Sequence, residues 1–373
     1  MEILHNVGST SLVDKWSKTQ MAIQNGVDLV IELPTVYATS SAENFADGAI
    51  KILDSLKVVD YVSFGAEIPN LQALEHLADI LYYEPKEYKA LLSIELDKGL
   101  SFPKARENDL MMYINDQKNV KKILASPNNI LAIEYIKALK KHKSKIQPYV
   151  ICRFESDYNS KKFTSNIASS TAIRNIIKNN GFNFLPKLMP QSALSILVQN
   201  IKTGHAIPDI SAFEKEIIYN LRKMSIDEIK NLPDVSEGLE YKIKEAASSC
   251  NTAIEFLNII KSKRYTSTRI QRILVYALLG ITKKDMEASK RTTPYIRVLG
   301  FSENGKYLLS EISKANPKLN IITSVKKFRD SNNKNRNLDI LLSKDIFATN
   351  VYTLGYDNDS WSNLDFTHKL IIE

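Results

Sequence analysis

The stretch VDLVIELPTVYATSSAENFADGAIKILDSLKVVDYVSFG, residues 27–65, contains a strand, a helix and a second strand in succession. Residues 27–33 form a mainly apolar run, which is typical of a strand that is buried on both faces. Residues 42–56 carry apolar side chains at helical spacing, and residues 58–64 form a second buried strand. Strands that alternate with helices in this way predict a parallel sheet that helices cover on both faces.

The pattern continues on the carboxyl side of this stretch. Further helices are predicted at residues 71–83, 88–98, 128–139 and 170–178, and a third strand at residues 146–152. This alternation favours an α/β fold with a Rossmann-like parallel sheet that helices cover on both faces. Ligands bind such sheets at the carboxyl ends of the strands, where Gly65 and Arg153 lie in this sequence.

The second half of the chain is mainly helical. Helices are predicted at residues 192–203, 210–223, 226–231, 239–248, 252–260 and 268–279. Short strands are predicted at residues 321–324 and 348–353, and a polar loop at residues 330–336. We therefore expect one domain at residues 1–180 and a mainly helical domain at residues 186–373, with the linker near residues 181–190.

Composition is that of a globular protein. Of the 373 residues, 44% are hydrophobic and 25% are charged, which is sufficient for a sizeable core. The sequence has no apolar run of about 18 residues and no signal-peptide pattern. The two cysteines, Cys152 and Cys250, do not form a metal-ligand pattern, so we expect a reducing cytoplasm. None of the five histidines pairs with another at ligand spacing, so no metal site is expected.

The formal net charge is +8. Two stretches are rich in cations: Lys137, Lys140, Lys141, Lys143 and Lys145 in one, and Lys261, Lys263, Arg264, Arg269 and Arg272 in the other. Clustered cations favour a polyanionic partner, whereas scattered lysines form an ordinary solvated surface. Charge alone leaves both interpretations open.

The most specific local signal is IASSTAIR, residues 167–174. Ser169 or Ser170 can cap a helix whose free N–H groups and dipole favour an anion. Arg174 lies one turn inside that helix and can neutralise phosphate charge. An ordinary capped helix with a surface arginine is the alternative interpretation.

Residues 167–174 are similar to the ISSTxIR element of class I synthetase-like adenylyltransferases. Further stretches narrow the resemblance to the tRNA(Met) cytidine acetate ligase family. They are LVDKWSKTQMAIQNGVDLVIELPTVYA (12–38), FGAE (64–67), SPNNILAIEY (126–135), the strand end at Arg153, VSEGLEYKI (235–243), KRYTSTRIQR (263–272) and PYIRVLG (294–300). They occur in the family's order along the chain.

This resemblance implies an enzyme that binds ATP, with Mg²⁺, and activates acetate as acetyl-adenylate. The acetyl group then passes to N4 of the wobble cytidine of elongator tRNA(Met). The resemblance implies that the ATP-binding residues are Gly65, Asn128, Arg153, Ser169, Thr171 and Arg174. Gly65 would let the nucleotide approach the strand end, and Asn128 would offer both a donor and an acceptor. Arg153 suits either phosphate oxygens or stacking on adenine.

The resemblance also implies that the second cationic stretch contacts tRNA. Its residues are Lys263, Arg264, Tyr265, Arg269 and Arg272. The cations would bind phosphates, and Tyr265 would stack on a base. A solvated charged surface is the alternative for this stretch.

The sequence departs from the family in one respect. Family members begin with a strand and an N-P-F-H-N-G-H loop whose histidines hold the ATP phosphates, and these 373 residues contain no H-x-G-H. We therefore expect a chain truncated at its N-terminus relative to the family, a sheet that lacks its first strands, and impaired catalysis with no assignable catalytic residue. A tRNA-binding protein without catalysis and an adenylyltransferase with another substrate are the alternatives.

Overall fold

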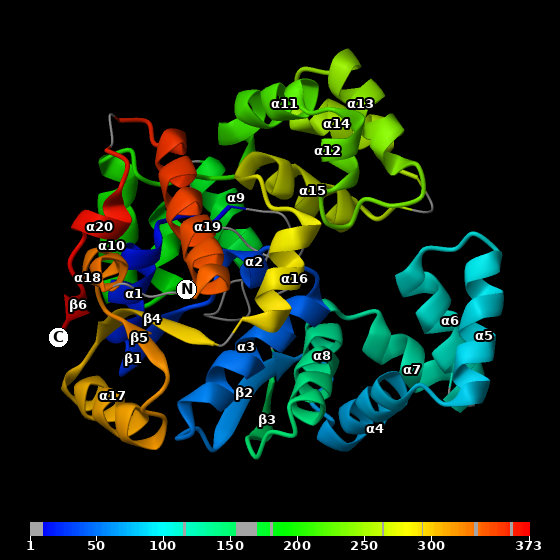
Figure 1. Cartoon of the computed structure of the whole chain (residues 1–373), viewed down its shortest axis with the longest axis horizontal. Helices are drawn as coiled ribbons and strands as arrows, with labels where there is room; N and C mark the ends of the chain where they lie inside the picture. The colour runs from blue at the N-terminus through cyan, green and yellow to red at the C-terminus, as the bar shows by residue number, and fades with distance from the viewer. Residues whose placement is uncertain are drawn as a thin grey trace. The chain divides into compact units, whose positions relative to one another are not determined.

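The computed structural model shown in Figure 1 has the predicted α/β fold. It describes residues 10–114, 117–153, 170–179, 182–262, 265–292, 294–331, 335–358 and 361–373. The chain divides into two compact units. Unit 1 comprises Met1–Ser40, Ser156–Ile260 and Gln271–Glu373, and unit 2 comprises Ser41–Glu155 and Lys261–Ile270. This division by compactness differs from a boundary near residue 180, because the first forty residues belong with the C-terminal half.

Unit 2 contains a pair of parallel strands and the helices that pack around them (Figure 1). Its elements are α3 (Ala42–Leu56), β2 (Tyr61–Ala66), α4 (Leu71–Tyr83), α5 (Lys86–Asp97), α6 (Phe102–Ile114), α7 (Gln117–Leu124), α8 (Pro127–Lys141) and β3 (Gln147–Cys152). β2 and β3 pair in parallel from Tyr61 opposite Gln147 to Ala66 opposite Cys152. The parallel pairing predicted for these two strands is therefore confirmed.

Apolar packing holds α8 over this pair of strands. Phe64 of β2 is buried, and its ring stacks on Tyr135 of α8 with centroids 5.4 Å apart. Ile133, on the same helix, is also buried in the core that α3 and α4 complete. Buried rings and branched side chains of this size each contribute about 1.5–3 kcal/mol to folding. The packing fixes the first turn of α8 beside the carboxyl ends of β2 and β3.

Unit 1 holds the remaining elements of the chain (Figure 1). Those before residue 240 are α1 (Lys15–Ile23), β1 (Leu29–Glu32), α2 (Thr35–Ala38), α9 (Ser170–Lys178), η1 (Phe182–Lys187), α10 (Gln191–Lys202), η2 (Ile210–Phe213), α11 (Glu214–Lys223), α12 (Ile226–Lys230) and α13 (Leu239–Ser249). Those after it are α14 (Ala253–Ile260), α15 (Ser267–Leu279), α16 (Lys283–Arg291), β4 (Tyr295–Phe301), α17 (Glu303–Ala315), β5 (Asn320–Ile322), α18 (Val325–Asp330), α19 (Arg336–Tyr352), η3 (Thr353–Gly355), α20 (Leu364–Thr367) and β6 (Ile371–Ile372). The first turn of α15 lies in unit 2.

The strand predicted at residues 27–33 lies in a different sheet from the one expected. β1 pairs antiparallel with β4, which in turn pairs in parallel with β5 and β6. Along β1, Val30 and Glu32 are buried and their neighbours are half-buried, so the strand has one buried face rather than two. β4 is buried at every residue except Phe301, and it supplies β1 with a partner that a local pattern does not indicate.

A buried ionic cluster links β1 and β4 to the helices α1 and α20. Lys15 of α1 has no exposed area, and its Nζ lies 2.7 Å from Glu32 and 2.8 Å from Asp365. Arg297 of β4 lies 2.6 Å from Asp365 and 3.6 Å from Glu32. Two cations and two carboxylates thus neutralise one another where water is excluded, and each depends on the others. We call these four residues the Lys15 cluster.

Asp345 of α19 lies next to this cluster. Its carboxylate accepts hydrogen bonds from the backbone N–H of Thr35 and the hydroxyl of Tyr295, both at 2.6 Å. Burial, followed by the charge of Glu32, raises the pKa of Asp345. The aspartate joins α19 to α2 and β4 within unit 1.

One prediction for the tail of the chain is wrong, and one strand there was not predicted. Residues 348–353 belong to α19 and η3 rather than to a strand. Their β-branched residues suggested a strand, but the buried positions Leu338, Leu342, Asp345 and Thr349 recur every three or four residues, which is helical spacing. The strand β4 was not predicted, although its residues from Tyr295 to Gly300 are all buried. No helix among the described residues has the length and apolar character that a membrane crossing requires.

Candidate nucleotide-binding site

Gly65 and Arg153 lie together at the carboxyl edge of β2 and β3. The backbone N–H of Arg153 donates to the carbonyl of Ala66 at 2.9 Å, which extends the parallel ladder past Cys152. A Cβ placed on Gly65 would lie 3.8 Å from Cβ of Arg153 and 4.0 Å from the carbonyl oxygen of Ile151. Both are ordinary contacts, so packing within the chain does not require glycine at this position. Glycine at this position is therefore not explained by packing among the described residues.

Asn128 joins this edge from the first turn of α8. Its Nδ2 donates to Oε1 of Glu67 at 2.6 Å, and its Oδ1 accepts a hydrogen bond from Arg153 at 3.1 Å. The two bonds fix which end of the amide faces the arginine. Three of the predicted ATP-binding residues, Gly65, Asn128 and Arg153, are thus brought together, and the exposed guanidinium is held at the edge of the sheet.

Glu67 is a residue of this candidate site to which the sequence pattern assigned no role. It follows β2 directly, and its Oε2 accepts from the backbone N–H of Asn129 at 3.1 Å. Its Oε1 also lies 3.4 Å from the backbone nitrogen of Asn128. Ser126 occupies the N-cap position of α8 but makes no side-chain capping bond, and Glu67 takes its place. An acidic residue just past a strand-ending glycine, in FGAE, was the available signal.

Arg174 belongs to unit 1 and has partners there. Its guanidinium donates to the carbonyl oxygen of Thr10 at 2.7 Å, and burial lowers its pKa. Helix α9, which carries it, is anchored by Ile173, Ile176 and Ile177 in a core with α10. Ser169 lies outside the described residues, and only the backbone of Thr171 is described. The proximity predicted between Ser170 and Arg174 on one helix is consistent with the observed bounds of α9.

The predicted RNA-contacting residues have internal partners where they are described. The guanidinium of Arg269 lies 5.2 Å from the ring centroid of Tyr265, and that ring is 8% exposed. Arg272 lies in unit 1 and donates to Asp234 at 2.7 Å. Lys263 and Arg264 lie outside the described residues.

The first cationic stretch is largely neutralised by its neighbours in unit 2. Lys137 pairs with Glu134, Lys140 with Asp79, and Lys141 with Asp47. His142 also bonds to Asp47, at 2.9 Å. Burial would raise the pKa of Asp47, but hydrogen bonds from His142 and Lys141 outweigh it and lower the pKa to about 2. This stretch therefore stabilises the fold of unit 2.

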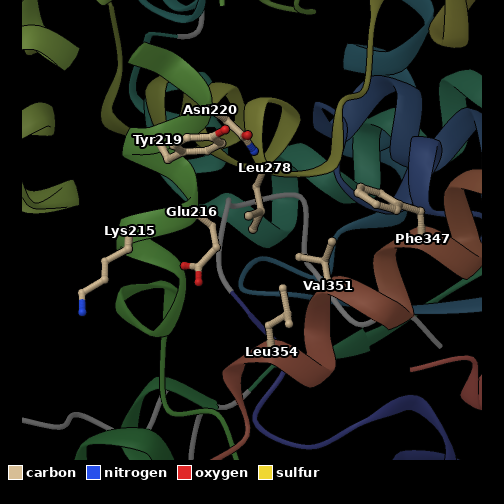
Figure 2. A pocket seen from close by; sticks show the side chains of 8 residues that line it. All are labelled: Lys215, Glu216, Tyr219, Asn220, Leu278, Phe347, Val351 and Leu354. Atoms are coloured by element: carbon tan, nitrogen blue, oxygen red, sulfur yellow. The ribbon is translucent and has the colours of Figure 1, made fainter. Parts of the chain in front are cut away.

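An apolar cavity of about 370 Å³ opens between α11, the end of α15 and α19 in unit 1 (Figure 2). Leu278, Val351, Leu354, Tyr219 and Phe347 are among the residues that line it. None of the predicted ATP- or RNA-binding residues that the structure describes lines it. Among the described lining residues the only cation is Lys215, so the cavity does not suit a triphosphate.

Comparison with known proteins identifies the family. Residues 6–365 match the HIGH Nucleotidyl Transferase family. A tRNA(Met) cytidine acetate ligase of Caldanaerobacter subterraneus subsp. tengcongensis is 46% identical over 98% of this chain and 88% of its own length. That of Acetivibrio thermocellus is 40% identical over 98% of this chain and 89% of its own length.

Solved structures agree with the sequence comparison. The crystal structure of Thermotoga maritima TmcAL bound with alpha-thio ATP superposes with a TM-score of 0.91 at 31% identity, covering 99% of this chain and 90% of that chain. Its apo form gives a TM-score of 0.92 at 32% identity. The chain therefore belongs to the HIGH nucleotidyl transferases and, within them, to the tRNA(Met) cytidine acetate ligase family.

Proposed function

We propose that this protein uses ATP and acetate to acetylate N4 of the wobble cytidine of elongator tRNA(Met). The observation that carries the proposal is the 46% identity, over 98% of this chain, to a protein named tRNA(Met) cytidine acetate ligase. The likeness to a structure bound with alpha-thio ATP supports the choice of nucleotide. Acetate is the acid that the relatives' name implies, and we expect Mg²⁺ to accompany the ATP.

The proposed reaction has two steps. An oxygen of acetate attacks the α-phosphate of ATP, forming acetyl-adenylate and releasing pyrophosphate. The N4 amine of cytidine then attacks the acetyl carbonyl, the C–O bond to the phosphate breaks, and AMP leaves. The amine loses one proton in the second step. Each step builds negative charge on phosphate oxygens, so a guanidinium positioned nearby lowers the barrier.

The residues at the β2–β3 edge provide binding and orientation in this proposal. Gly65 leaves space for the nucleotide, and Asn128 holds Arg153 in place through its amide oxygen. Arg174 and the N-terminal end of α9, with Ser169 and Thr171 beside it, would bind phosphate oxygens. The bond from Arg174 to the carbonyl of Thr10 leaves other guanidinium N–H groups free for that task.

Contact with tRNA is assigned to the second cationic stretch. In this proposal Lys263, Arg264 and Arg269 bind the RNA phosphates. The ring of Tyr265 packs against the guanidinium of Arg269 and helps to orient it. Arg272 would contribute by exchanging its bond to Asp234 for a phosphate. In this proposal residues 1–180 bind and activate the substrates, residues 186–373 bind tRNA, and the protein works in the cytoplasm.

Acetylation of tRNA tests the proposal. The purified chain is incubated with ATP, radiolabelled acetate and elongator tRNA(Met), and the nucleosides are separated after digestion. The proposal predicts labelled N4-acetylcytidine that depends on ATP and is absent with a transcript whose wobble cytidine is replaced by uridine. Salt-sensitive tRNA binding without any label in cytidine would support a binding protein instead.

Acetate-dependent exchange of pyrophosphate into ATP measures the first step alone. The proposal predicts exchange that requires acetate, and the absence of such exchange would contradict the formation of acetyl-adenylate.

A further inference from the structure

The first turn of α8 already holds an anion of the protein's own. Pro127 has no N–H group, and the next two backbone N–H groups of the helix, those of Asn128 and Asn129, face the carboxylate of Glu67. A helix start with free N–H groups attracts phosphate, but here the carboxylate occupies them. A phosphate placed at this helix start would also meet the negative charge of Glu67.

The same carboxylate sets the orientation of two residues of the candidate site. Its 2.6 Å bond from Nδ2 of Asn128 leaves Oδ1 of that amide directed at Arg153. Asn129 holds this arrangement in place, because its Oδ1 accepts from the backbone of Ile68 and its Nδ2 donates to the carbonyl of Ile123, both at 3.1 Å. Asn129 has no exposed area, so the frame behind Glu67 is rigid.

We infer that Glu67 is a positioning residue that reserves the carboxyl edge of β2 and β3 for the nucleoside part of ATP. It orients Asn128 and Arg153 and keeps the triphosphate away from the start of α8. The inference rests on the proposed ATP-dependent function. Arg153 has two possible roles, stacking on adenine and binding phosphate oxygens. Under this inference its guanidinium stacks on the purine and does not bind phosphate.

The planar guanidinium supports this assignment. Arg153 is exposed, and its Cβ lies beside Gly65, 3.8 Å from where a Cβ on that glycine would be. One edge of the guanidinium is used by Oδ1 of Asn128, so its face remains available to a flat ring. Glu67 and Oδ1 of Asn128 are acceptors, which suit the exocyclic amine and hydroxyl groups of adenosine and repel phosphate oxygens.

Separate ligands for the two ends of ATP test the inference. The full chain is titrated with ATP, with adenosine and with inorganic tripolyphosphate, and the same titrations are made with Arg153→Gln and Glu67→Gln. For Arg153→Gln we expect the affinities for ATP and adenosine to fall by the same factor, about tenfold, with tripolyphosphate unchanged. For Glu67→Gln we expect weaker adenosine binding and equal or stronger tripolyphosphate binding, which a merely structural role would not produce.

Glu107→Gln is the matched control, because it removes one negative charge from unit 2 at an exposed pair with Lys104. It should leave all three affinities unchanged. The inference is overturned if Arg153→Gln weakens tripolyphosphate and ATP while adenosine is unaffected. If Glu67→Gln does not fold, Arg153→Gln still decides, since α8 keeps its cap in that variant. Absence of ATP binding by the wild-type chain would instead refute the proposed function itself.

Discussion

Replacing Lys15 with methionine probes the Lys15 cluster most sharply. Lys15 has no exposed area and contacts Glu32 at 2.7 Å and Asp365 at 2.8 Å. Methionine preserves the length and apolar stem of the side chain but removes its charge. Glu32 and Asp365 then face each other with Arg297 as the one remaining cation of the cluster.

The expected loss follows from burial. Breaking a buried ion pair by removing one partner costs about 3–5 kcal/mol, because the other charge is left without compensation. Lys314 offers a matched control in the same unit, since its Nζ lies 2.8 Å from Glu311 but its side chain is 69% exposed. Removing Lys314 should have no measurable effect, because water screens exposed pairs.

Urea unfolding followed by circular dichroism at pH 8 measures both variants. We expect Lys15→Met to lower the midpoint strongly with an unchanged slope, and Lys314→Met to match the wild type. Burial opposes ionisation of Asp365, but Lys15 and Arg297 more than offset it and lower its pKa. Because the pKa of Asp365 is lower in the folded protein, its ionised form stabilises the fold at pH values above 3.8, the pKa in the unfolded chain. The difference in urea midpoint between Lys15→Met and the wild type should therefore shrink as the pH falls below 3.8. Equal midpoints for the two variants at pH 8 would refute the reasoning.

Three further changes have expected outcomes. Gly65→Ala should leave the melting temperature nearly unchanged, because the new Cβ makes ordinary contacts at 3.8 and 4.0 Å, while calorimetric ATP affinity falls about tenfold. The pKa of Asp47 is lowered from 3.8 to about 2, so its ionised form stabilises the folded protein above pH 3.8. Asp47→Asn should therefore lower the free energy of unfolding by about 2 kcal/mol at pH 7, and the loss should largely disappear near pH 2, as measured by urea titration. Burial, followed by the charge of Glu95, raises the pKa of Asp109 to about 6, so its ionisation costs stability above pH 6. Asp109→Asn should therefore stabilise the protein by roughly 1–2 kcal/mol at pH 8 and not at pH 3, by the same titration.

Each of these has a contradicting result. A large drop in melting temperature for Gly65→Ala would show that glycine is needed by the fold. A pH-independent effect of Asp47→Asn or Asp109→Asn would show that the ionised form of the side chain is not what matters.

Local patterns predicted the elements of unit 2 closely. The predicted helices 42–56 and 71–83 coincide with α3 and α4. Apolar spacing marks these helices, and a polar residue before each one, such as Asn70 before α4, marks its start. The strands β2 and β3 and their parallel pairing also followed from composition and order.

Partners distant in sequence could not be predicted in this way. The pairing of β1 with β4, for example Val30 opposite Gly300, joins strands that lie far apart in the sequence, so a local pattern does not indicate it. Helical spacing of buried residues in α19 was masked by β-branched residues near its end.

At the candidate site, the resemblance located Gly65, Asn128 and Arg153, and the structure brings them together. It did not assign a role to Glu67. The bond from Asn128 to Glu67 joins residues that lie 61 positions apart, so no local pattern reports it. Charged residues inside apolar stretches, such as Glu32 and Arg297, are the sequence signal for the Lys15 cluster.

Photo-crosslinking tests the central claim that the nucleotide binds at the carboxyl edge of β2 and β3. The chain is irradiated with 8-azido-ATP, whose reactive group is on the purine, and the labelled peptides are mapped by mass spectrometry. We predict label in the peptides that hold β2, the start of α8 and the end of β3, reduced by excess ATP and in Arg153→Gln. Label that excess ATP displaces from other peptides, with none in these three, would contradict it.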